Sequence, residues 1–299
     1  MNLKQLGCTG IQVSEIALGT WKYRGGAEPL RVGIELGATF IDTAESYGTE
    51  QTVGEAIRGI RDSVFVASKV SPLHFRYNDV IRAAECSLKQ LNTDYLDLYQ
   101  LHWPNYRIAI AETMAAMERL VDEGKIRFIG LSNFSVAEMK QAQRQLSRAR
   151  IVSNQVKYSL VCRDPEDGLL EYCKANGVSL LAFSPLATGP GVLTRLDKGD
   201  VLGQVAAEVS KTWAQVALNW CMARPEVIVI FKADKTEHVR ENCGASGWCL
   251  NAEQHARLAK GVKPVQNRSA MERFGRRVVR RVVQYAGRSL GGPTAMDIE

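Results

Sequence analysis

Four residues of the types that move protons stand at or just beyond the ends of short apolar segments. Asp42 ends the segment "FID", Lys69 ends "VFVASK" and His102 ends "DLYQLH". Tyr47 follows Asp42 inside the loop "TAESYG". A carboxylate beside an ammonium keeps the ammonium charged, and an ammonium beside a phenol favours the phenolate. Such a set suits protonation of a carbonyl oxygen while another group attacks the carbon.

The expected role of Tyr47 depends on its pKa. An ammonium and a phenolate about 4 Å apart attract by about 4 kcal/mol at an effective dielectric constant near 20. Asp42 would cancel part of this attraction, so we expect the pKa of Tyr47 to fall below its ordinary value near 10. Tyr47 would then exchange protons near neutral pH. A neutral His102 would hydrogen-bond a substrate oxygen and direct it toward Tyr47.

Each of the four residues also has an ordinary structural explanation. Asp42 would serve as a helix cap, Lys69 as a rim lysine, His102 as a buried core residue and Tyr47 as loop packing. The functional interpretation therefore depends on whether the fold brings all four side chains to one place.

Short apolar segments alternate with segments of helical periodicity along most of the chain. We predict strands at 16–18, 39–42, 64–69, 96–101, 126–131, 152–155, 179–183 and 227–230. We predict helices at 29–37, 50–59, 78–91, 108–123, 136–146, 165–176, 204–223 and 236–243. The apolar residues Ile110, Met114 and Met117 recur at the three- and four-residue intervals of a helix with one apolar face. Ser135 and Glu138 have the spacing of a helix-capping box.

Eight strand-helix units without a linker predict a single α/β domain, a (β/α)8 TIM barrel, at residues 1–262. The segment at 3–18 is expected to open the chain with a small hairpin. Catalytic groups of such barrels lie at the C-terminal ends of the strands. Lys69 shares its strand parity with Ala67, and His102 with Gln100, so inward alternation would bring both to the barrel mouth.

Composition favours a soluble globular protein. The chain has 299 residues, of which 45% are hydrophobic and 23% charged. No apolar run approaches the roughly 20 residues that cross a bilayer. The start, "MNLKQLGCTG", lacks the apolar stretch of a signal peptide. A cytoplasmic location is the expectation.

The seven cysteines are odd in number and have no CxxC spacing. This pattern favours reduced thiols over a disulfide framework or a zinc site, and we expect no metal.

Residues 263–299 form a C-terminal tail with its own charge pattern. Six Arg and one Glu at 271–290 supply +5 of the net charge of +6, so the remainder is nearly neutral. Nucleic-acid binding by the main body is therefore not supported. As a helix, this segment would be basic and amphipathic, which is typical of binding to an anionic membrane or a partner. We favour packing of its apolar side on the barrel or another subunit.

The chain resembles the aldo-keto reductase superfamily from about Leu6 to Trp248. The resemblance is carried, in this order, by "LGTW", "FIDTAESYG", "VASK", "LHWP", "GLSNF", "NQVKY", "FSPL" and "FKADKTEHVRENCGA". It implies an NAD(P)H-dependent carbonyl reductase with Asp42, Tyr47, Lys69 and His102 as the catalytic tetrad. Nicotinamide would deliver hydride to the carbonyl carbon while Tyr47 acts as general acid.

No GxGxxG follows a predicted strand, so a Rossmann dinucleotide site is not expected. The resemblance implies instead that Ser132, Asn133 and Gln155 hold the nicotinamide carboxamide. Phe183 would stack on the ring, at a position where the family more often has Tyr. The full set expected to bind coenzyme is Gly19, Thr20, Trp21, Asp42, Ser132, Asn133, Gln155, Phe183, Ser184, Pro185, Leu186, Lys232, Ala233, Asp234, His238, Glu241 and Asn242.

The coenzyme is expected to be NADP, with NADPH favoured over NADH. Lys232 matches the family's lysine for the 2′-phosphate, and Lys235 adds a second positive charge. Ala233 stands where Ser is common, and His238 where many members have Arg. A neutral imidazole binds a phosphate dianion less strongly than a guanidinium does, so NAD remains an alternative. Phe231 replaces the usual Pro.

Trp21, Tyr23 and Trp103 fall in or near predicted mouth loops and are expected to line the substrate pocket. An aromatic rim suits an apolar or aromatic carbonyl compound. The expected partner is therefore a small-molecule carbonyl substrate.

Two other functions are compatible with these residues. A cofactor-binding sensor with little turnover, as in reductase-like potassium-channel β subunits, is the first. A barrel aldolase with Lys69 as its Schiff-base lysine is the second. Its nucleophile must be the free amine, which an adjacent carboxylate disfavours.

Overall fold

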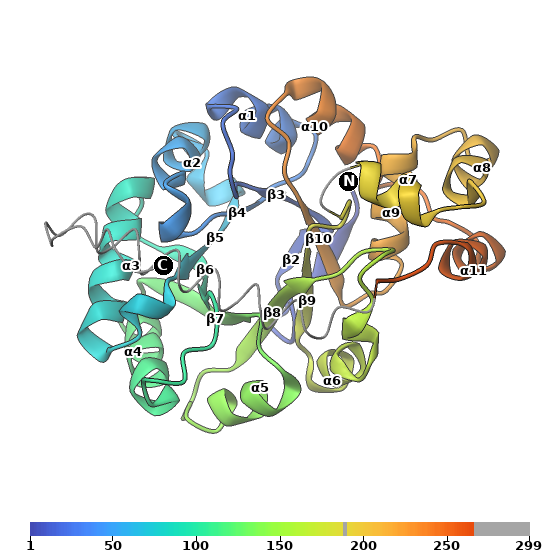
Figure 1. Cartoon of the computed structure of the whole chain (residues 1–299). Coiled ribbons are helices and arrows are strands. Elements are labelled where there is room, and N and C mark those ends of the chain that lie inside the picture. Colours follow the sequence, from blue (N-terminus) through green and yellow to red (C-terminus); the bar gives the residue numbers. More distant parts are fainter. Residues whose placement is uncertain (188–189, 266–299) are drawn as a thin grey trace, which may run out of the picture. The chain divides into compact units, whose positions relative to one another are not determined.

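The computed structural model describes residues 1–187 and 190–265. Eight parallel strands close into a barrel in the order β10-β3-β4-β5-β6-β7-β8-β9 (Figure 1). The strands are β3 (Ile16–Gly19), β4 (Phe40–Asp42), β5 (Phe65–Val70), β6 (Leu96–Leu101), β7 (Ile126–Ser132), β8 (Ile151–Lys157), β9 (Ser179–Phe183) and β10 (Val227–Phe231). The predicted TIM barrel is confirmed, and each of its strands overlaps a predicted one.

Helices surround the barrel (Figure 1). They are α1 (Ala27–Glu35), α2 (Glu50–Ile57), α3 (Tyr77–Leu91), α4 (Ile110–Asp122), α5 (Val136–Gln143), α6 (Leu169–Asn176), α7 (Pro190–Leu196), α8 (Val201–Glu208), α9 (Trp213–Met222), α10 (Thr236–Cys243) and α11 (Ala252–Gly261). Short 3-10 helices lie at Glu45–Tyr47, Arg61–Ser63, Pro72–His74 and Asp164–Glu166. The predicted capping box of α5 is present, because Ser135 and Glu138 bond each other's backbone N–H groups.

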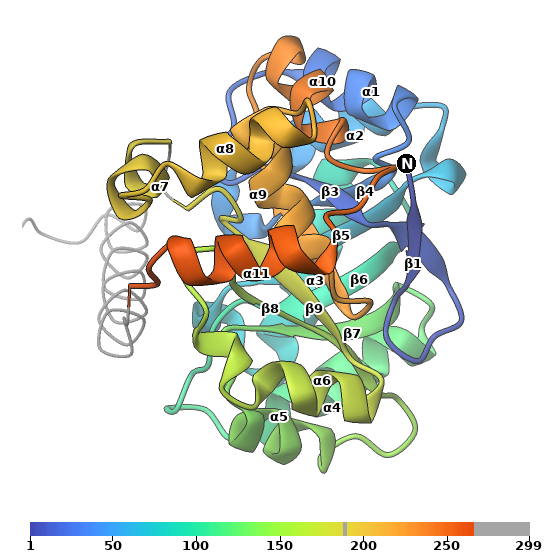
Figure 2. The same cartoon turned by 90° about the vertical axis from the view of Figure 1, so that its right-hand side faces the viewer.

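The predicted N-terminal hairpin is formed by β1 (Leu3–Gln5) and β2 (Gln12–Ser14), which pair antiparallel and lie at one end of the barrel (Figure 2). Leu6 and Val13 pack with side chains from the barrel interior, among them Phe40, Ala67 and Leu98. The hairpin therefore fills the end of the barrel at which the strands begin, and the other end is left for chemistry.

The strand register sets the heights of the inward side chains. Lys69 on β5 pairs with Gln100 on β6, and Gln100 pairs with Gly130 on β7. Ala67 belongs to the inner cluster, whereas Val66 belongs to the outer one, so the predicted parity of β5 is confirmed. Lys69 and Gln100 therefore lie next to each other inside the barrel, near the C-terminal ends of their strands.

One helix prediction is wrong. The single helix expected at 204–223 is two helices, α8 and α9, separated by residues 209–212. Ser210 has a left-handed φ of 51°, and Thr212 caps α9 in a capping box with Gln215. Helices α7 and α11 were not predicted at all.

Two further expectations concern thiols and membranes. All seven cysteines lie among the described residues and are free. Within the described ranges, no helix is both long and apolar enough to cross a bilayer. The predicted amphipathic helix at 271–290 lies outside the described residues.

Candidate active site

Asp42 and Lys69 form a buried ion pair. Asp42 ends β4, and its Oδ2 accepts a hydrogen bond of 2.6 Å from Lys69 Nζ. The ammonium is fully buried and also donates to the carbonyl oxygen of Thr43 at 2.8 Å. Burial lowers the pKa of Lys69, while the Asp42 carboxylate opposes this effect by favouring the ammonium. The predicted pairing of the two side chains is confirmed.

The other carboxylate oxygen of Asp42 also has partners. Oδ1 accepts from Gln155 Nε2 at 2.7 Å and from Gln100 Nε2 at 3.3 Å. Gln155 was expected to bind coenzyme, whereas Gln100 was not predicted as a site residue. Its inward parity with His102 was the signal in the sequence that pointed to it.

Tyr47 lies in the 3-10 helix Glu45–Tyr47, which follows β4. Its hydroxyl oxygen is 3.3 Å from His102 Nε2. Lys69 Nζ lies over the phenol ring, 4.8 Å from its centroid. The structure therefore brings all four residues of the predicted tetrad together.

The predicted fall in the pKa of Tyr47 is wrong. Burial raises the pKa of Tyr47 well above its ordinary value, and the negative charge of Asp42 acts in the same direction. The ammonium faces the ring of Tyr47, and its charge is shared with Asp42 at 2.6 Å. The phenol consequently keeps its proton at neutral pH, which is the state that a general acid requires.

His102 is neutral at physiological pH. Burial lowers the pKa of His102 well below its ordinary value, and the nearby Lys69 ammonium lowers it further. Nδ1 lies 3.4 Å from Ser46 Oγ, and the backbone carbonyl accepts from Asn133 Nδ2 at 3.1 Å. A neutral imidazole next to the Tyr47 hydroxyl fits the expected role of orienting a substrate oxygen.

A chain of threonine hydroxyls supports the end of β4. Thr49 Oγ1 donates to Thr20 Oγ1 at 2.9 Å and lies 3.0 Å from Thr43 Oγ1. Thr20 Oγ1 in turn donates to the carbonyl oxygen of Asp42 at 3.1 Å. Thr20 was predicted to bind coenzyme, and in the structure its hydroxyl fixes the backbone of Asp42. Thr43 and Thr49 were missed.

Glu45 fastens the short helix that carries Tyr47 to the loop after β5. Its carboxylate accepts from the Ser71 backbone N–H and lies 3.1 Å from His74 Nδ1. The hydrogen bond with Glu45 raises the pKa of His74, although partial burial opposes the rise. Strands β4 and β5 supply Asp42 and Lys69, so the Glu45 contacts link the segments that follow both residues.

We expect this contact to make stability depend on pH. A raised folded-state pKa gives stability that is fully present below the ordinary histidine value of 6.5 and is lost as pH rises through the folded value. Because the His74 side chain is half exposed, the contribution should be only about 0.2–1 kcal/mol. Urea unfolding should show His74→Gln less stable than wild type at acidic pH, with the difference vanishing at alkaline pH. A difference independent of pH would contradict the ion pair.

The residues expected around the nicotinamide lie at the ends of β7 and β8. Ser132 Oγ donates to the Gln155 backbone carbonyl at 3.0 Å. Asn133 adopts a left-handed φ of 66°, and its amide nitrogen also donates to Ser132 Oγ at 3.0 Å. Asn133 Oδ1 is buried and has no hydrogen-bond partner among the described residues. An acceptor left free beside the tetrad fits a ligand that carries an N–H donor, as a carboxamide does.

The residues expected around the phosphates follow β9 and β10. Phe183 ends β9, half-buried, and Ser184 has a left-handed φ of 52°. Lys232 forms an ion pair with Asp234, whose Oδ1 accepts from the Arg24 backbone N–H at 2.9 Å. The remaining residues of this group are Pro185 and Leu186 after Ser184, Ala233 after Lys232, and His238, Glu241 and Asn242 on α10.

The β3 loop contributes further expected residues. Gly19 ends β3, where a Cβ atom would lie 2.8 Å from Ile230 Cγ2 on β10. Trp21 is 48% exposed, and the Lys22 ammonium lies over its ring. Tyr23 is buried and donates its hydroxyl to the Gly26 carbonyl at 2.8 Å, a position that supports the loop.

Trp103 follows His102 directly and is 8% exposed. Exposed Trp21 and nearly buried Trp103 thus follow the C-terminal ends of β3 and β6, as expected for residues of mouth loops.

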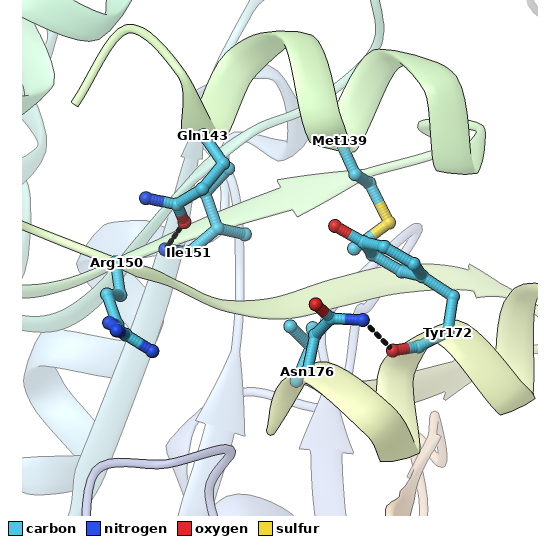
Figure 3. A pocket seen from close by; sticks show the side chains of 7 residues that line it. Met139, Gln143, Arg150, Ile151, Tyr172 and Asn176 are labelled. Atoms are coloured by element: carbon cyan, nitrogen blue, oxygen red, sulfur yellow. Dashed lines mark hydrogen bonds between the residues drawn. The ribbon is translucent and has the colours of Figure 1, made fainter.

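A hollow of about 230 Å³ lies elsewhere, between α5 and α6 (Figure 3). Its lining residues are Met139, Gln143, Arg150, Ile151, Tyr172, Asn176 and Val178, none of which belongs to the tetrad. The Gln143 and Asn176 amides are bonded to backbone groups (Figure 3). We attach no function to this hollow.

The chain is similar in sequence and fold to known proteins. The methylglyoxal reductase YeaE of Escherichia coli is 40% identical over 81% of this chain and 86% of its own length. The glyoxal reductase of Bacillus subtilis is 35% identical, over 82% of this chain and 87% of its own. An aldo-keto reductase from Klebsiella pneumoniae, solved in complex with NADPH, is 38% identical with a TM-score of 0.82, covering 90% of this chain and 98% of that one.

The model of the Aldo/keto reductase family matches residues 15–263, a range that begins just before β3 and ends just after α11. It therefore includes the whole barrel and every residue of the tetrad. Together with the arrangement of Asp42, Tyr47, Lys69 and His102 at the barrel mouth, this match establishes that the chain belongs to the aldo/keto reductase family.

Proposed function

We propose that this protein reduces aldehydes or ketones to alcohols, reversibly, with NADPH, and that residues 1–262 form the catalytic unit. Tyr47 supplies the proton that the carbonyl oxygen takes up. The observation that carries the proposal is the tetrad itself. A protonated phenol lies 3.3 Å from a neutral imidazole and faces an ammonium that is paired with a buried carboxylate.

Each residue of the tetrad has a distinct role. Tyr47 holds its proton at neutral pH, and His102 orients the carbonyl oxygen through a hydrogen bond. Lys69 places a positive charge over the face of the phenol ring, which favours the developing negative charge on the phenolate oxygen. Asp42 holds the ammonium in position. The bound coenzyme supplies hydride to the carbonyl carbon.

The mouth also has groups that fit the coenzyme. Asn133 Oδ1, a buried acceptor without a partner, accepts from the carboxamide N–H of nicotinamide. Ser132 and Gln155 also bind the carboxamide, and Phe183 at the end of β9 stacks on the nicotinamide ring. Relatives support NADP as the coenzyme, because two aldo-keto reductase structures from Klebsiella pneumoniae contain NADP and NADPH.

The preference between NADPH and NADH depends on the ion pair of Lys232 with Asp234. Lys232 binds the 2′-phosphate, and the Asp234 carboxylate competes with that phosphate for the ammonium. Asp234→Ser should therefore tighten NADPH binding by up to about fivefold, since a partly exposed pair contributes up to about 1 kcal/mol. NADH binding should change by less than about twofold, because NADH lacks the 2′-phosphate.

Titrations of protein fluorescence with each coenzyme measure this directly. Lys232→Met is the opposing variant and should weaken NADPH binding more than NADH binding. If Asp234→Ser changed the affinity for both coenzymes equally, the 2′-phosphate would lie elsewhere.

The substrates proposed first are α-oxoaldehydes such as methylglyoxal and glyoxal. This choice is supported by two relatives, which are named for reduction of these compounds and are 40% and 35% identical to this chain. Trp21 and Trp103 add aromatic surface, which also suits apolar or aromatic aldehydes.

A substrate panel tests the proposal. Loss of NADPH absorbance should accompany addition of methylglyoxal, glyoxal and benzaldehyde derivatives, with the corresponding alcohols as products. Tight coenzyme binding without turnover of any carbonyl compound would support a cofactor-binding sensor instead. Borohydride trapping of a carbonyl ligand on Lys69 would support the aldolase alternative.

A further inference from the structure

The barrel interior contains a buried amide that the proposed reaction does not yet use. Gln100 lies on β6, two residues before His102, and its side chain has no solvent exposure. In the strand register it stands between Lys69 on β5 and Gly130 on β7. Other inward residues on the same strands, such as Ala67 and Leu98, are apolar. A buried glutamine at this level of the barrel therefore needs a hydrogen-bond partner.

That partner is the catalytic carboxylate. Gln100 Nε2 donates to Asp42 Oδ1 at 3.3 Å, and Gln155 Nε2 donates to the same oxygen at 2.7 Å. The second oxygen, Oδ2, accepts from Lys69 Nζ at 2.6 Å. Three donors from β5, β6 and β8 thus converge on one carboxylate that ends β4. Removal of either amide donor leaves the carboxylate more freedom to turn away from the ammonium.

Placing the Gln100 amide inside the barrel costs free energy, because only one end of the amide is hydrogen-bonded within the described part of the chain. Its Oε1 is buried and has no hydrogen-bond partner among the described residues. Leaving a polar atom unsatisfied costs about 1–3 kcal/mol, and an apolar side chain of similar size would avoid this cost. The bond to an ionised acceptor offsets part of the cost, because hydrogen bonds to charged groups contribute about 1.5–3 kcal/mol. Structural packing alone gives no reason for an amide here.

The neighbouring strand makes room for this side chain. A Cβ atom on Gly130 would lie 2.8 Å from Gln100 Cγ and would also collide with Ser153 Oγ. Gly130 pairs with Gln100 on one side and with Ser153 on β8 on the other. A glycine at this point lets Gln100 extend within the barrel and reach Asp42.

We propose that Gln100 is a positioning residue for the reaction: by donating to Asp42 Oδ1, it fixes the carboxylate that in turn holds the Lys69 ammonium over the Tyr47 ring. This inference rests on the proposed carbonyl reduction and deepens it. Gln100 acts through Asp42 and touches neither substrate nor coenzyme.

The first variant is Gln100→Met, which keeps the length of the side chain and removes its donor. We expect kcat to fall about five- to tenfold, because Gln155 and Lys69 still hold Asp42. KM and the dissociation constant of NADPH should change by less than about twofold, because Gln100 makes no contact that binds substrate or coenzyme in the ground state. Ser153→Ala is the matched control. It removes another buried polar atom without a partner from the same layer of the barrel, and its kcat should stay within about twofold of wild type.

The second variant is Gln100→Glu, which distinguishes positioning from packing. The charged groups nearest the introduced carboxyl are Asp42 on β4 and Lys69 on β5, with the titratable His102 two residues on along β6 and Tyr47 beyond it. A protonated carboxyl donates to Asp42 as the amide does, whereas an ionised one repels Asp42 and competes for Lys69. The kcat of this variant should therefore approach wild type at acidic pH and fall as pH rises, through an ionisation that wild type and Ser153→Ala lack.

The outcomes separate the two proposals. The positioning role is overturned if Gln100→Met keeps the wild-type kcat, or if its kcat falls no more than that of Ser153→Ala. Either result leaves the proposed carbonyl reduction intact. A Gln100→Glu profile parallel to that of wild type overturns the positioning role as well. If wild-type protein binds NADPH but reduces no carbonyl compound, the proposed function fails, and the positioning role fails with it.

Discussion

Tyr47→Phe is expected to lower kcat for carbonyl reduction by about 10²–10⁴-fold, the usual contribution of a positioned general acid. The variant loses the hydroxyl that lies 3.3 Å from His102 Nε2 and keeps the ring that faces Lys69. The affinity for NADPH should remain within about twofold of wild type, because the phenol proton is needed only in the transition state. Steady-state kinetics with methylglyoxal and fluorescence titration with NADPH measure the two effects separately.

Tyr95→Phe is the matched control for this variant. It removes a phenol hydroxyl that bonds Asp62. Tyr95 and Asp62 precede β6 and β5, at the opposite ends of these strands from His102 and Lys69, so kcat should be unchanged. A Tyr47→Phe variant with full activity would remove Tyr47 as the acid. An equal loss of activity and of NADPH binding would mean that Tyr47 serves binding rather than proton transfer.

Lys69→Met is expected to abolish most turnover and to lower the free energy of unfolding by about 3–5 kcal/mol. Lys69 is fully buried, and its loss leaves the Asp42 carboxylate as an unpaired buried charge. Urea unfolding at neutral pH measures the loss of stability, and NADPH oxidation by methylglyoxal measures the loss of turnover. A variant as stable as wild type would contradict the buried ion pair.

The double variant Asp42→Asn/Lys69→Met separates stability from catalysis. Without either charge, the Asn oxygen can still accept from the Gln155 and Gln100 amides. We expect most of the stability lost in Lys69→Met to return, since no unpaired buried charge remains. Turnover should stay low, because the positive charge over the phenol ring is still missing. Recovery of turnover together with stability would show that Lys69 acts only structurally.

Local patterns were enough to predict the barrel. Each predicted strand of three to six residues lies next to a helical segment, and this alternation has few solutions other than a parallel barrel. Strand parity also placed Lys69 and His102 correctly, because inward and outward side chains must alternate along a strand. The contact between Asp42 and Lys69 follows from two neighbouring strands that end at the same barrel mouth.

Helix boundaries in the last third of the chain were harder to predict. Residues 209–212, between α8 and α9, include no Gly or Pro, so the helical periodicity predicted one continuous helix. The break is set by Ser210 in the left-handed region and by the capping box of Thr212 with Gln215. "TWAQ" carries that signal, and "NAEQ" before α11 carries the same one through Asn251 and Gln254.

The error in the pKa of Tyr47 has a different origin. The sequence shows that an ammonium is near a phenol, but not whether it meets the hydroxyl or the ring. In the structure the Lys69 ammonium faces the ring of Tyr47. Burial and the negative charge of Asp42 therefore decide the pKa shift of Tyr47, and both raise it. The bond from Gln100 to Asp42 and the ion pair of Lys232 with Asp234 likewise depend on side-chain rotamers, which periodicity does not fix.

The most direct test of the account is the distance from Tyr47 Oη to the carbonyl oxygen of a ligand bound together with NADP. A crystal structure of this ternary complex should place the carbonyl oxygen about 2.6–3.2 Å from both Tyr47 Oη and His102 Nε2, the reach of a proton donor and its partner. The carbonyl carbon should face the nicotinamide. A carbonyl oxygen held by other groups, with Tyr47 out of hydrogen-bonding reach in the complete complex, would contradict Tyr47 as the proton donor.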